Sequence, residues 1–427
     1  MSTNTQKPAA KSTSRKFAKS VIEIWLWGGP SQLETFDPKP DAPHDYNNGL
    51  KSIKSSCGYE LHEWLPELAK CSELYTIIRS MTHPFPGHET ATYLMQTGRN
   101  PGGGVTFPAL GALISSSRVK GPGKANSVQS DLLYEGDLPP FVILTHAKGR
   151  FSEVGFLGEE YAPLVTGGSA SAKRFEVDGI VPPGGLTQEQ IMDRFNRASR
   201  IDRLPPDDEF EKAGAAAREI ILGKAAETFD LTREKEQTRK RYGVKANGTS
   251  YTEIGQQLLA ARRLVEYGVP YISINYSGWD SHKRHFETMK QPTFEMDMAV
   301  SALLTDLNER GLLDSTIVWL SGEFGRVPKV DRQPPWNGGR NHFPRCFSAL
   351  VAGGGFKGGQ VVGKSDETTD HWKERPVTPQ DFLGSIMELA GVDPDDRLPN
   401  PKWLKEYGPV MSPTVKSQCG RLKEIYV

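Results

Sequence analysis

The sequence predicts an α/β fold built on a mostly parallel sheet. Short runs of β-branched and aromatic residues alternate with longer segments whose apolar residues recur at helical spacing. Glycine and proline break these runs, as in the tight loop Gly28-Gly29-Pro30-Ser31 that follows the first of them. Strands that alternate with helices imply a parallel sheet with helices on both faces.

Six runs are predicted to be buried strands, because each is short and rich in apolar, β-branched and aromatic residues. In chain order they cover residues 21–27, 74–78, 141–145, 270–275, 315–320 and 347–352.

Five segments are predicted to be helices, and they cover residues 61–68, 88–96, 254–267, 293–309 and 378–390. Gly98 and Gly268 stand where the end of a helix favours a left-handed residue. Thr378 and Asp381 have the spacing of an N-terminal capping box.

The chain is expected to form one domain over residues 19–427, preceded by a disordered segment, 1–18, that is polar and basic. Residues of about 120–250 are less regular and contain a highly charged stretch, 200–242, with apolar residues at roughly helical spacing. We expect this region to be a partly helical insertion or cap.

The overall charge gives no case for nucleic acid or an anionic membrane as partner, since 52 basic residues balance 52 acidic ones among the 427. Four scattered cysteines indicate reduced thiols, with a Cys57–Cys71 disulfide left open. The N-terminal segment has no apolar stretch, so the chain as written is expected to be cytoplasmic, and export stays open if the start site is misassigned.

Polar clusters follow two of the predicted strands, where ligands collect in an α/β sheet. Asp280 and His282 come after strand 270–275, and as positions i and i+2 of extended chain both could reach one ion. His285 could join them only if a helix begins there. The alternative is a loop in which Asp280 caps a helix and His282 lies on the surface.

Glu323 and Arg326 follow strand 315–320, and they could bind a metal and an anionic oxygen, respectively, or form an ordinary salt bridge. Arg340 and His342 end a loop rich in glycine and asparagine. The histidine could ligate the same metal and the arginine could bind phosphate or sulfate, unless the loop is a solvent-exposed turn.

His88 stands at the start of the helix predicted at 88–96, where backbone amides and the helix dipole favour an anion. The alternative is a capping loop. Thr90, close by, and Ser31, in the loop after the first strand, are the expected substrate contacts.

Together these motifs resemble the DUF1501 family, a bacterial group of unknown function that is abundant in planctomycetes and related to the sulfatase and alkaline phosphatase superfamily. The resemblance extends from about residue 20 to 395, and its motifs lie at 28–40, 78–83, 261–266, 278–282, 322–326 and 339–342. It implies the superfamily's fold, a three-layer α/β/α sandwich with a doubly wound, mostly parallel sheet.

The resemblance also implies roles for single residues. Superfamily members place a nucleophile nine residues before a Thr-Gly pair, and here Thr97-Gly98 puts His88 in that position. His88 would then either attack the substrate or bind a metal.

Asp280 and His282 resemble an Asp-plus-His metal pair, Glu323 replaces the aspartate of a Ser-Asp-His-Gly strand end, and His342 resembles the last metal histidine. Phe324 replaces a further histidine and the first-strand aspartate has no counterpart, so the resemblance implies one metal rather than two.

The first functional hypothesis is a metal-dependent hydrolase of sulfate or phosphate esters. Its expected metal ligands are Asp280, His282, Glu323 and His342, and its expected catalytic residues are His88, Arg326 and Arg340. The cofactor would be a divalent ion such as zinc, manganese or calcium.

Two alternatives stay open. One is a catalytically degenerate sulfatase-like protein that binds an anionic ligand, such as a sulfated glycan, without turnover. The other is a structural or partner-binding role of the charged region 200–250. The sequence leaves the oligomeric state open.

Overall fold

The structure, a computed structural model, describes residues 16–119, 130–144, 153–167, 188–201, 223–243, 252–396, 398 and 419–427. Most of the segment that we predicted to be disordered, 1–18, therefore lies outside the described residues. Ala18 is nevertheless buried, and its N–H donates to the carbonyl oxygen of Leu389 at 2.9 Å, so the packed chain begins before residue 19.

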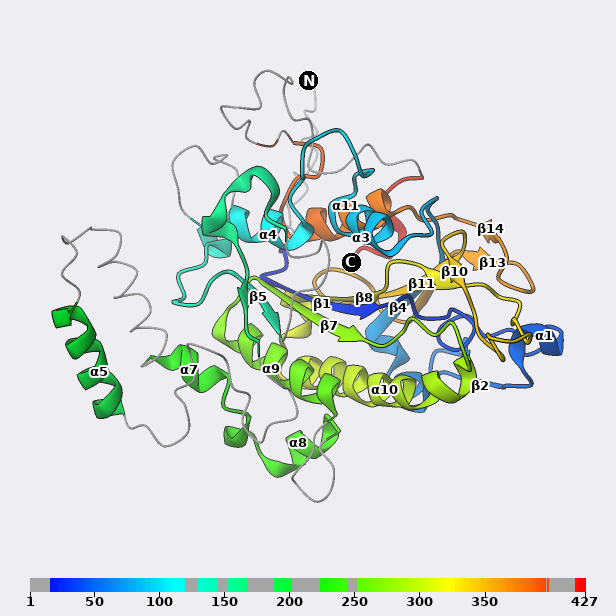
Figure 1. Ribbon diagram of the computed structural model, residues 1–427, viewed down its shortest axis with the longest axis horizontal. Helices are drawn as coiled ribbons and strands as arrows, with labels where there is room; N and C mark the ends of the chain where they lie inside the picture. The colour runs from blue at the N-terminus through cyan, green and yellow to red at the C-terminus, as the bar shows by residue number, and fades with distance from the viewer. Residues whose placement is uncertain are drawn as a thin grey trace, which may run out of the picture.

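An eight-stranded sheet forms the centre of the molecule (Figure 1). From edge to edge its strands are β12 (Gln360–Val362), β4 (Tyr75–Met81), β11 (Phe347–Ala352), β8 (Thr316–Ser321), β1 (Ser20–Trp27), β7 (Tyr271–Ser277), β5 (Phe141–Leu144) and β6 (Leu164–Val165). All six predicted strands are among them.

The sheet is parallel except at β11, which pairs antiparallel with both β4 and β8. At its centre β1 lies between β7 and β8 and pairs parallel with both. The α/β class and the mostly parallel sheet are therefore confirmed, whereas no sequence pattern indicated the reversed direction of β11.

Helices cover both faces of the sheet, as Figure 1 shows. On one side lie α3 (His88–Thr97), α4 (Leu110–Arg118) and α11 (Pro379–Leu389), and on the other lie α2 (Pro66–Lys70), α9 (Glu253–Tyr267) and α10 (His285–Glu309). Alternate residues of β1 supply the two cores, Ile22, Ile24 and Leu26 on the α9–α10 side and Val21 and Trp25 on the other.

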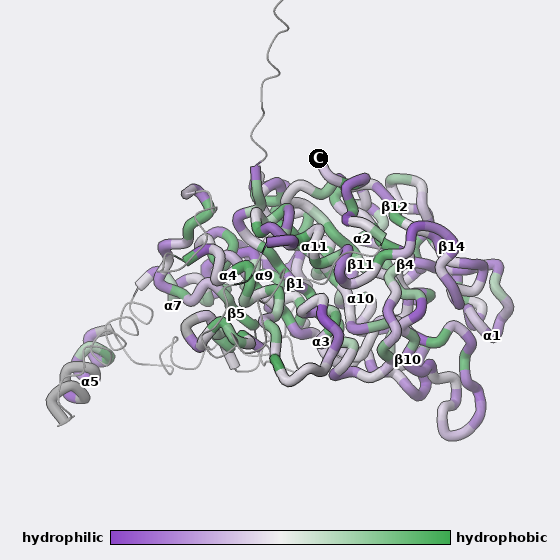
Figure 2. The backbone as a smooth tube through the Cα atoms, turned by 90° about the horizontal axis from the view of Figure 1, so that it is seen from above, coloured by the Kyte–Doolittle hydropathy of each residue, from purple (hydrophilic) through white to green (hydrophobic). Residues whose placement is uncertain are grey.

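Three small hairpins lie outside the central sheet: β2 (Ser52–Lys54) with β3 (Glu60–His62), β9 (Gly325–Arg326) with β10 (His342–Phe343), and β13 (Lys364–Ser365) with β14 (Trp372–Glu374). Within the described ranges, the other α-helices are α1 (His44–Asn47), α5 (Gln188–Ile201), α7 (Lys224–Thr228) and α8 (Glu236–Arg241). Figure 2 shows hydrophilic chain around α1 and β14 and hydrophobic chain along the inner strands β1 and β5.

The helix ends form as their residues predict. Gly98 and Gly268 end α3 and α9 in the left-handed conformation, with φ of 67° and 99°. Thr378 and Asp381 form the predicted capping box of α11.

The helix that we predicted at 61–68 is wrong in its first half. Glu60–His62 form strand β3, which pairs with Ser52–Lys54, and the helix begins only at Pro66. Proline is well suited to the first turn of a helix because it lacks an N–H to satisfy, so Pro66 fixes the start.

Part of the region expected to be an insertion, about 120–250, belongs to the main body. It supplies the sheet strands β5 and β6, while α7 packs against α9 and α8 against α10. Residues 202–222 of its charged stretch lie outside the described residues. Among the residues described, no helix combines the length and the apolar character needed to cross a membrane.

Candidate metal centre

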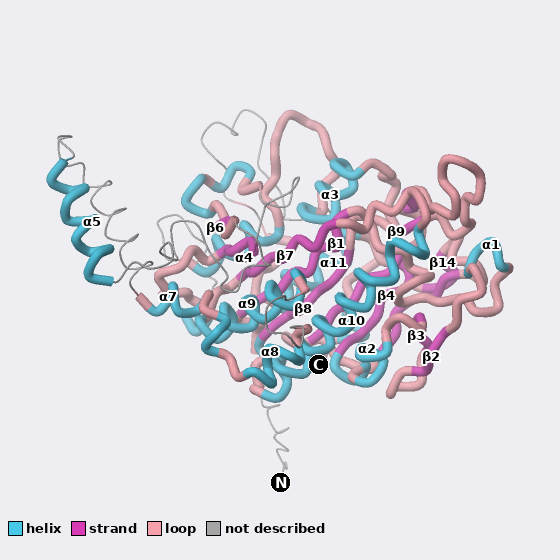
Figure 3. Tube along the Cα trace, turned by 60° about the horizontal axis from the view of Figure 1, so that its bottom comes forward, coloured by secondary structure: helices cyan, strands magenta, loops and turns pink. Residues whose placement is uncertain are grey.

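The polar clusters that we singled out in the sequence meet at one edge of the sheet. Asp280 and His282 follow β7, and Glu323 follows β8, so both loops leave strands that pair with β1. His88 begins α3 and His342 lies on β10. Figure 3 shows α3 and β9 close to the end of β1, and the parallel direction of β1, β7 and β8 accounts for this convergence.

Three imidazoles surround the carboxylate of Asp280. The Nε2 atoms of His282 and His342 lie 3.0 and 3.1 Å from Asp280 Oδ1. The Nε2 atom of His88 lies 3.4 Å from Asp280 Oδ2. His282 Nε2 and His342 Nε2 are 3.0 Å apart.

The other nitrogen of each imidazole contacts an oxygen. Nδ1 of His88 lies 2.6 Å from Glu323 Oε1, Nδ1 of His342 lies 2.8 Å from the carbonyl oxygen of Pro86, and Nδ1 of His282 lies 2.9 Å from Asn341 Oδ1. An oxygen at Nδ1 orients each ring so that Nε2 is the nitrogen turned toward Asp280. This arrangement is typical of histidines that ligate a metal.

The geometry fits a single divalent ion. Donors at about 2.0–2.2 Å from a tetrahedral zinc ion lie roughly 3.3–3.6 Å from one another. His88, Asp280 and His342 each offer a ligand atom within 4.8 Å of the others, and the individual contacts of 3.0–3.4 Å need only small adjustments. His282 is not part of this group of three, but its Nε2 lies 3.0 Å from both Asp280 Oδ1 and His342 Nε2. We call the four residues His88, Asp280, His282 and His342 the His3Asp cluster.

The cluster is partly exposed to solvent, and contacts among its side chains shift the pKa values of Asp280 and His88. Asp280 is 40% exposed and His282 31%, so small molecules can approach. Partial burial opposes ionisation of Asp280, but contacts to His342, His88 and Arg326 outweigh it and hold its pKa well below the usual range. Hydrogen bonds to Asp280 and Glu323 raise the pKa of His88 to about 9, against the effect of its burial.

Glu323, which we expected to be a metal ligand, lies behind His88. Its carboxylate is fully buried and accepts the backbone N–H of Gly28 at 3.0 and 3.2 Å in addition to the contact with His88. Glu323 therefore lies on the far side of His88 from Asp280 and contacts Nδ1 of that ring, while Nε2 faces Asp280.

Arg326 and Arg340 are both fully buried, although we expected each to bind a substrate anion. Arg326 contacts Asp280 Oδ1 and donates to the carbonyl oxygens of Gly28, Gly29 and Arg340. Arg340 pairs with Glu34 at 2.7 Å. Neither guanidinium faces solvent, so both support the cluster from within.

The residues that the structure describes show no contact of Ser31 or Thr90, the two expected substrate contacts, with the four cluster side chains. Ser31 is buried at 3% exposure in the loop after β1. Thr90 donates to the carbonyl oxygen of Gly87 at 3.0 Å and is half-buried on the first turn of α3.

Sequence reasoning missed three supporting residues. Asn341 adjoins the predicted His342 and contacts His282, and His83 lies 2.6 Å from the carbonyl oxygen of Glu323 through its Nε2. Burial lowers the pKa of His83 to about 4, so it is neutral. Glu34 lies within one of the family-like motifs, yet nothing in its local sequence showed that it would pair with Arg340.

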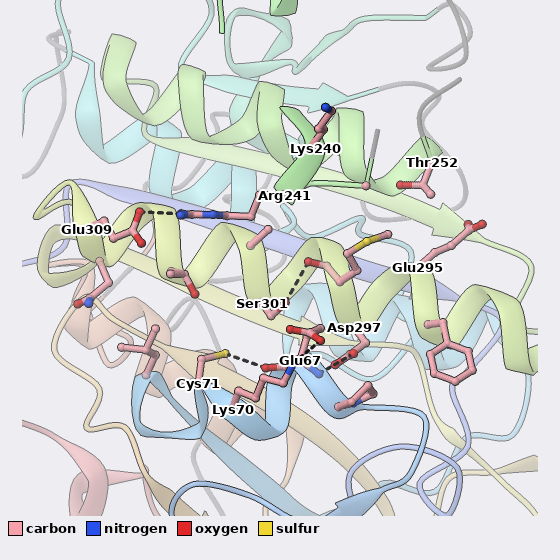
Figure 4. A pocket seen from close by; sticks show the side chains of 18 of the residues that line it. Glu67, Lys70, Cys71, Lys240, Arg241, Thr252, Glu295, Asp297, Ser301 and Glu309 are labelled. Carbon is pink, nitrogen blue, oxygen red and sulfur yellow. Dashed lines mark hydrogen bonds and ion pairs between the residues drawn. The ribbon is translucent and has the colours of Figure 1, made fainter. Parts of the chain in front are cut away.

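A cavity of about 1090 Å³ lies elsewhere, along α10 between α2 and α8 (Figure 4). Figure 4 shows Glu67 and Asp297 beside each other on its wall. Asp297 is buried and accepts the backbone N–H groups of Glu67 and Leu68 at 2.9 and 2.8 Å. The cavity shares no residue with the His3Asp cluster.

Residues 18–402 match the model of a family described as "Protein of unknown function (DUF1501)". No curated protein matches the chain.

Several solved structures resemble the chain at low sequence identity. They include Ps i-CgsB in complex with k-i-k-neocarrahexaose (11% identity, 88% of this chain and 73% of that one, TM-score 0.40) and the lipoteichoic acid synthase LtaP from Listeria monocytogenes (11%, 95% and 79%, 0.38). TAB5 alkaline phosphatase matches at 11% identity over 89% of this chain and 100% of its own, with a TM-score of 0.34. Similarity this distant assigns no residue role, and the roles below depend on the geometry of the site alone.

Proposed function

The chain belongs to the DUF1501 family, and we propose that this member is a metal-dependent hydrolase of sulfate or phosphate esters. One observation carries the proposal: three histidine Nε2 atoms converge on the carboxylate of Asp280, each with its Nδ1 held by an oxygen. Such an arrangement is difficult to explain by packing, because it brings three partly exposed imidazoles together with their Nε2 atoms toward one carboxylate.

The ligands would be the His3Asp cluster, a revision of the set predicted from sequence. A bound divalent ion would supply Lewis-acid polarisation of the ester oxygen and lower the pKa of a coordinated water. Glu323 would hold the His88 ring in the orientation that presents Nε2. Arg326 would keep Asp280 ionised and fixed against the end of β1.

The donor set favours zinc over calcium. Calcium prefers six to eight oxygen ligands, whereas three imidazoles and one carboxylate suit zinc, with manganese and iron as further candidates. Since Arg326 and Arg340 are committed to protein acceptors, the negative charge of a substrate would be met chiefly by the ion itself.

A second candidate is a protein that binds an anionic ligand, such as a sulfated glycan, without turnover. The residue that begins α3 favours this candidate. It is a histidine and therefore offers no hydroxyl or thiol nucleophile, and both ring nitrogens of His88 already contact carboxylates, those of Glu323 and Asp280.

Turnover of chromogenic esters tests the first proposal. The protein would be stripped with a chelator, reconstituted with zinc or manganese, and assayed with 4-nitrophenyl sulfate and 4-nitrophenyl phosphate. We expect release of nitrophenol that disappears on chelation and in His342→Ala, but persists in His371→Ala, which removes an exposed histidine outside the cluster.

Metal uptake without hydrolysis of either ester, combined with thermal stabilisation by a sulfated oligosaccharide, would instead support the second candidate. Failure of the protein to take up any metal would overturn the hydrolase proposal and leave the ligand-binding candidate, which requires no ion.

A further inference from the structure

Glu34 joins the two segments that carry most of the His3Asp cluster. Its Oε1 accepts from the Arg340 guanidinium at 2.7 Å, and its Oε2 lies 2.9 Å from His285 Nε2. All three side chains are almost completely buried, at 0–3% exposure. Glu34 itself belongs to the loop after β1 and is distant in sequence from both partners.

His285 connects Glu34 to the first segment, which contains Asp280, Ser281 and His282. Its Nδ1 lies 2.5 Å from the hydroxyl oxygen of Ser281, the residue between the cluster members Asp280 and His282. Burial holds the pKa of His285 below its ordinary value. Because the Glu34 carboxylate can only accept, Nε2–H of His285 donates to it, and Nδ1 faces the Ser281 hydroxyl.

Arg340 connects Glu34 to the second segment, which consists of Arg340, Asn341 and His342. Adjacent to it, Gly339 lies so close to the first segment that a Cβ atom there would stand 1.7 Å from the carbonyl oxygen of His282. The two segments are therefore in direct backbone contact. Glu34 links them a second time through its contacts with Arg340 and His285.

The chain of Ser281, His285 and Glu34 has the composition of a nucleophilic triad, but it is closed to substrate. Ser281 is only 6% exposed, and its hydroxyl contacts His285 on the side away from solvent. A triad requires its hydroxyl to reach the reacting atom. The arrangement therefore serves to hold the loop in place.

We propose that Glu34 is the positioning residue of the metal centre, fixing the Asp280–His282 segment through His285 and Ser281 and the Asn341–His342 segment through Arg340. The inference rests on the proposed function, because it assumes that the cluster binds a metal. Glu34 touches no cluster member itself and acts only through these partners.

Removing the charge of Glu34 should loosen the cluster without removing a ligand. Residues that orient metal ligands typically change metal affinity by tenfold to a hundredfold when mutated. In Glu34→Gln we expect the zinc Kd, measured by competition with a chromophoric chelator, to rise by about that factor. The absorption spectrum of the cobalt-substituted variant should also change, since it reports the geometry of the ligands.

Asp297→Asn is the matched control. Asp297 is also a buried carboxylate that joins separate elements, and it lies on the same helix as His285 but about 18 Å further along it. The control should lose thermal stability as Glu34→Gln does, yet keep the zinc Kd and the cobalt spectrum of the wild type.

Ser281→Ala provides a second route if Glu34→Gln fails to fold, because it cuts the path to Asp280 and His282 while leaving the pair of Glu34 and Arg340 intact. We expect a smaller rise in the zinc Kd, roughly threefold to tenfold. Wild-type affinity in both folded variants would overturn the positioning role while leaving the metal centre standing. If wild-type protein itself bound no metal, the proposed function would fail and this inference with it.

Discussion

Glu323 Oε1 lies 2.6 Å from His88 Nδ1, and the same carboxylate accepts the backbone N–H of Gly28. The end of β8, the end of β1 and the start of α3 are thereby joined at one buried acid. This contact holds His88 with its Nε2 toward Asp280. The orientation of the His88 ring therefore depends on how β1, β8 and α3 are placed around Glu323.

Glu323→Gln tests this relation. A neutral amide is a weaker acceptor for the His88 N–H, so we expect the zinc Kd to rise by about tenfold to a hundredfold in a chelator competition. Glu374→Gln, which changes an exposed glutamate on β14, should leave the Kd unaltered. Equal affinities in the two variants would contradict the orienting role of Glu323.

Gly28→Ala should damage the site through backbone contact. Gly28 has a φ of +113°, and a Cβ atom there would stand 2.2 Å from the backbone nitrogen of Asp280. Gly278→Ala is the control, because Gly278 has a similar φ of +107° and open space around its Cβ position.

Both glycine variants should lose about 1–2 kcal/mol of unfolding free energy from the unfavourable φ. Gly28→Ala alone should lose a further 2 kcal/mol or so from the clash and bind zinc at least roughly tenfold more weakly. Chemical denaturation and metal titration measure the two effects. If the variants behaved alike, the close approach of Gly28 to Asp280 would be refuted.

Arg326→Met should destabilise the protein strongly. The fully buried guanidinium contacts Asp280 and three backbone carbonyl oxygens, all of which would lose their donor. We expect a loss of roughly 2–4 kcal/mol in urea unfolding. Arg284→Met, which breaks an exposed pair with Glu287, should cost less than about 1 kcal/mol.

Glu23→Gln should remove a pH dependence of stability. Glu23 is buried within β1 without a cationic partner, and burial raises its pKa from 4.5 to about 7 against hydrogen bonds from Tyr271 and Gln96. The folded state therefore binds a proton more tightly than the unfolded state does. The stability from this group is fully present below about pH 4.5 and is lost as the pH rises to about 7.

In consequence, Glu23→Gln should be more stable than the wild type at pH 8, by an amount on the order of 3 kcal/mol at most, and the gain should shrink at pH 5. The Oε1 atom of Gln96, which lacks a hydrogen-bond partner, could accept from the new amide. Unfolding by urea at the two pH values measures the difference. A gain that is the same at both would contradict the raised pKa.

The sequence predicted the fold well where the signal is local. Continuous apolar runs such as 21–27 and 315–320 can only be buried between two layers, and glycines such as Gly98 and Gly268 mark helix ends through their conformational freedom. The direction of β11 could not be predicted, because an apolar run is the same whichever way the strand pairs.

For the site, the sequence singled out residues that the structure brings together, but it did not indicate how deeply each one is buried. Asp280, His282 and His342 meet because parallel strands end at one edge of the sheet, which sequence patterns can indicate. Whether a carboxylate such as Glu323 faces the cluster directly or lies behind a histidine depends on side-chain direction and burial. These follow from tertiary packing, as does the burial of Arg326 and Arg340.

The most direct test of the account is the metal content of the purified protein after reconstitution with zinc, measured by mass spectrometry for wild type, a His88→Ala/His342→Ala variant and the His371→Ala control. The His3Asp cluster predicts about one zinc ion per chain in the wild type and the control, and a near-complete loss in the double variant. Zinc retained by the double variant, or absent from the wild type, would contradict the assignment of the cluster as a metal centre.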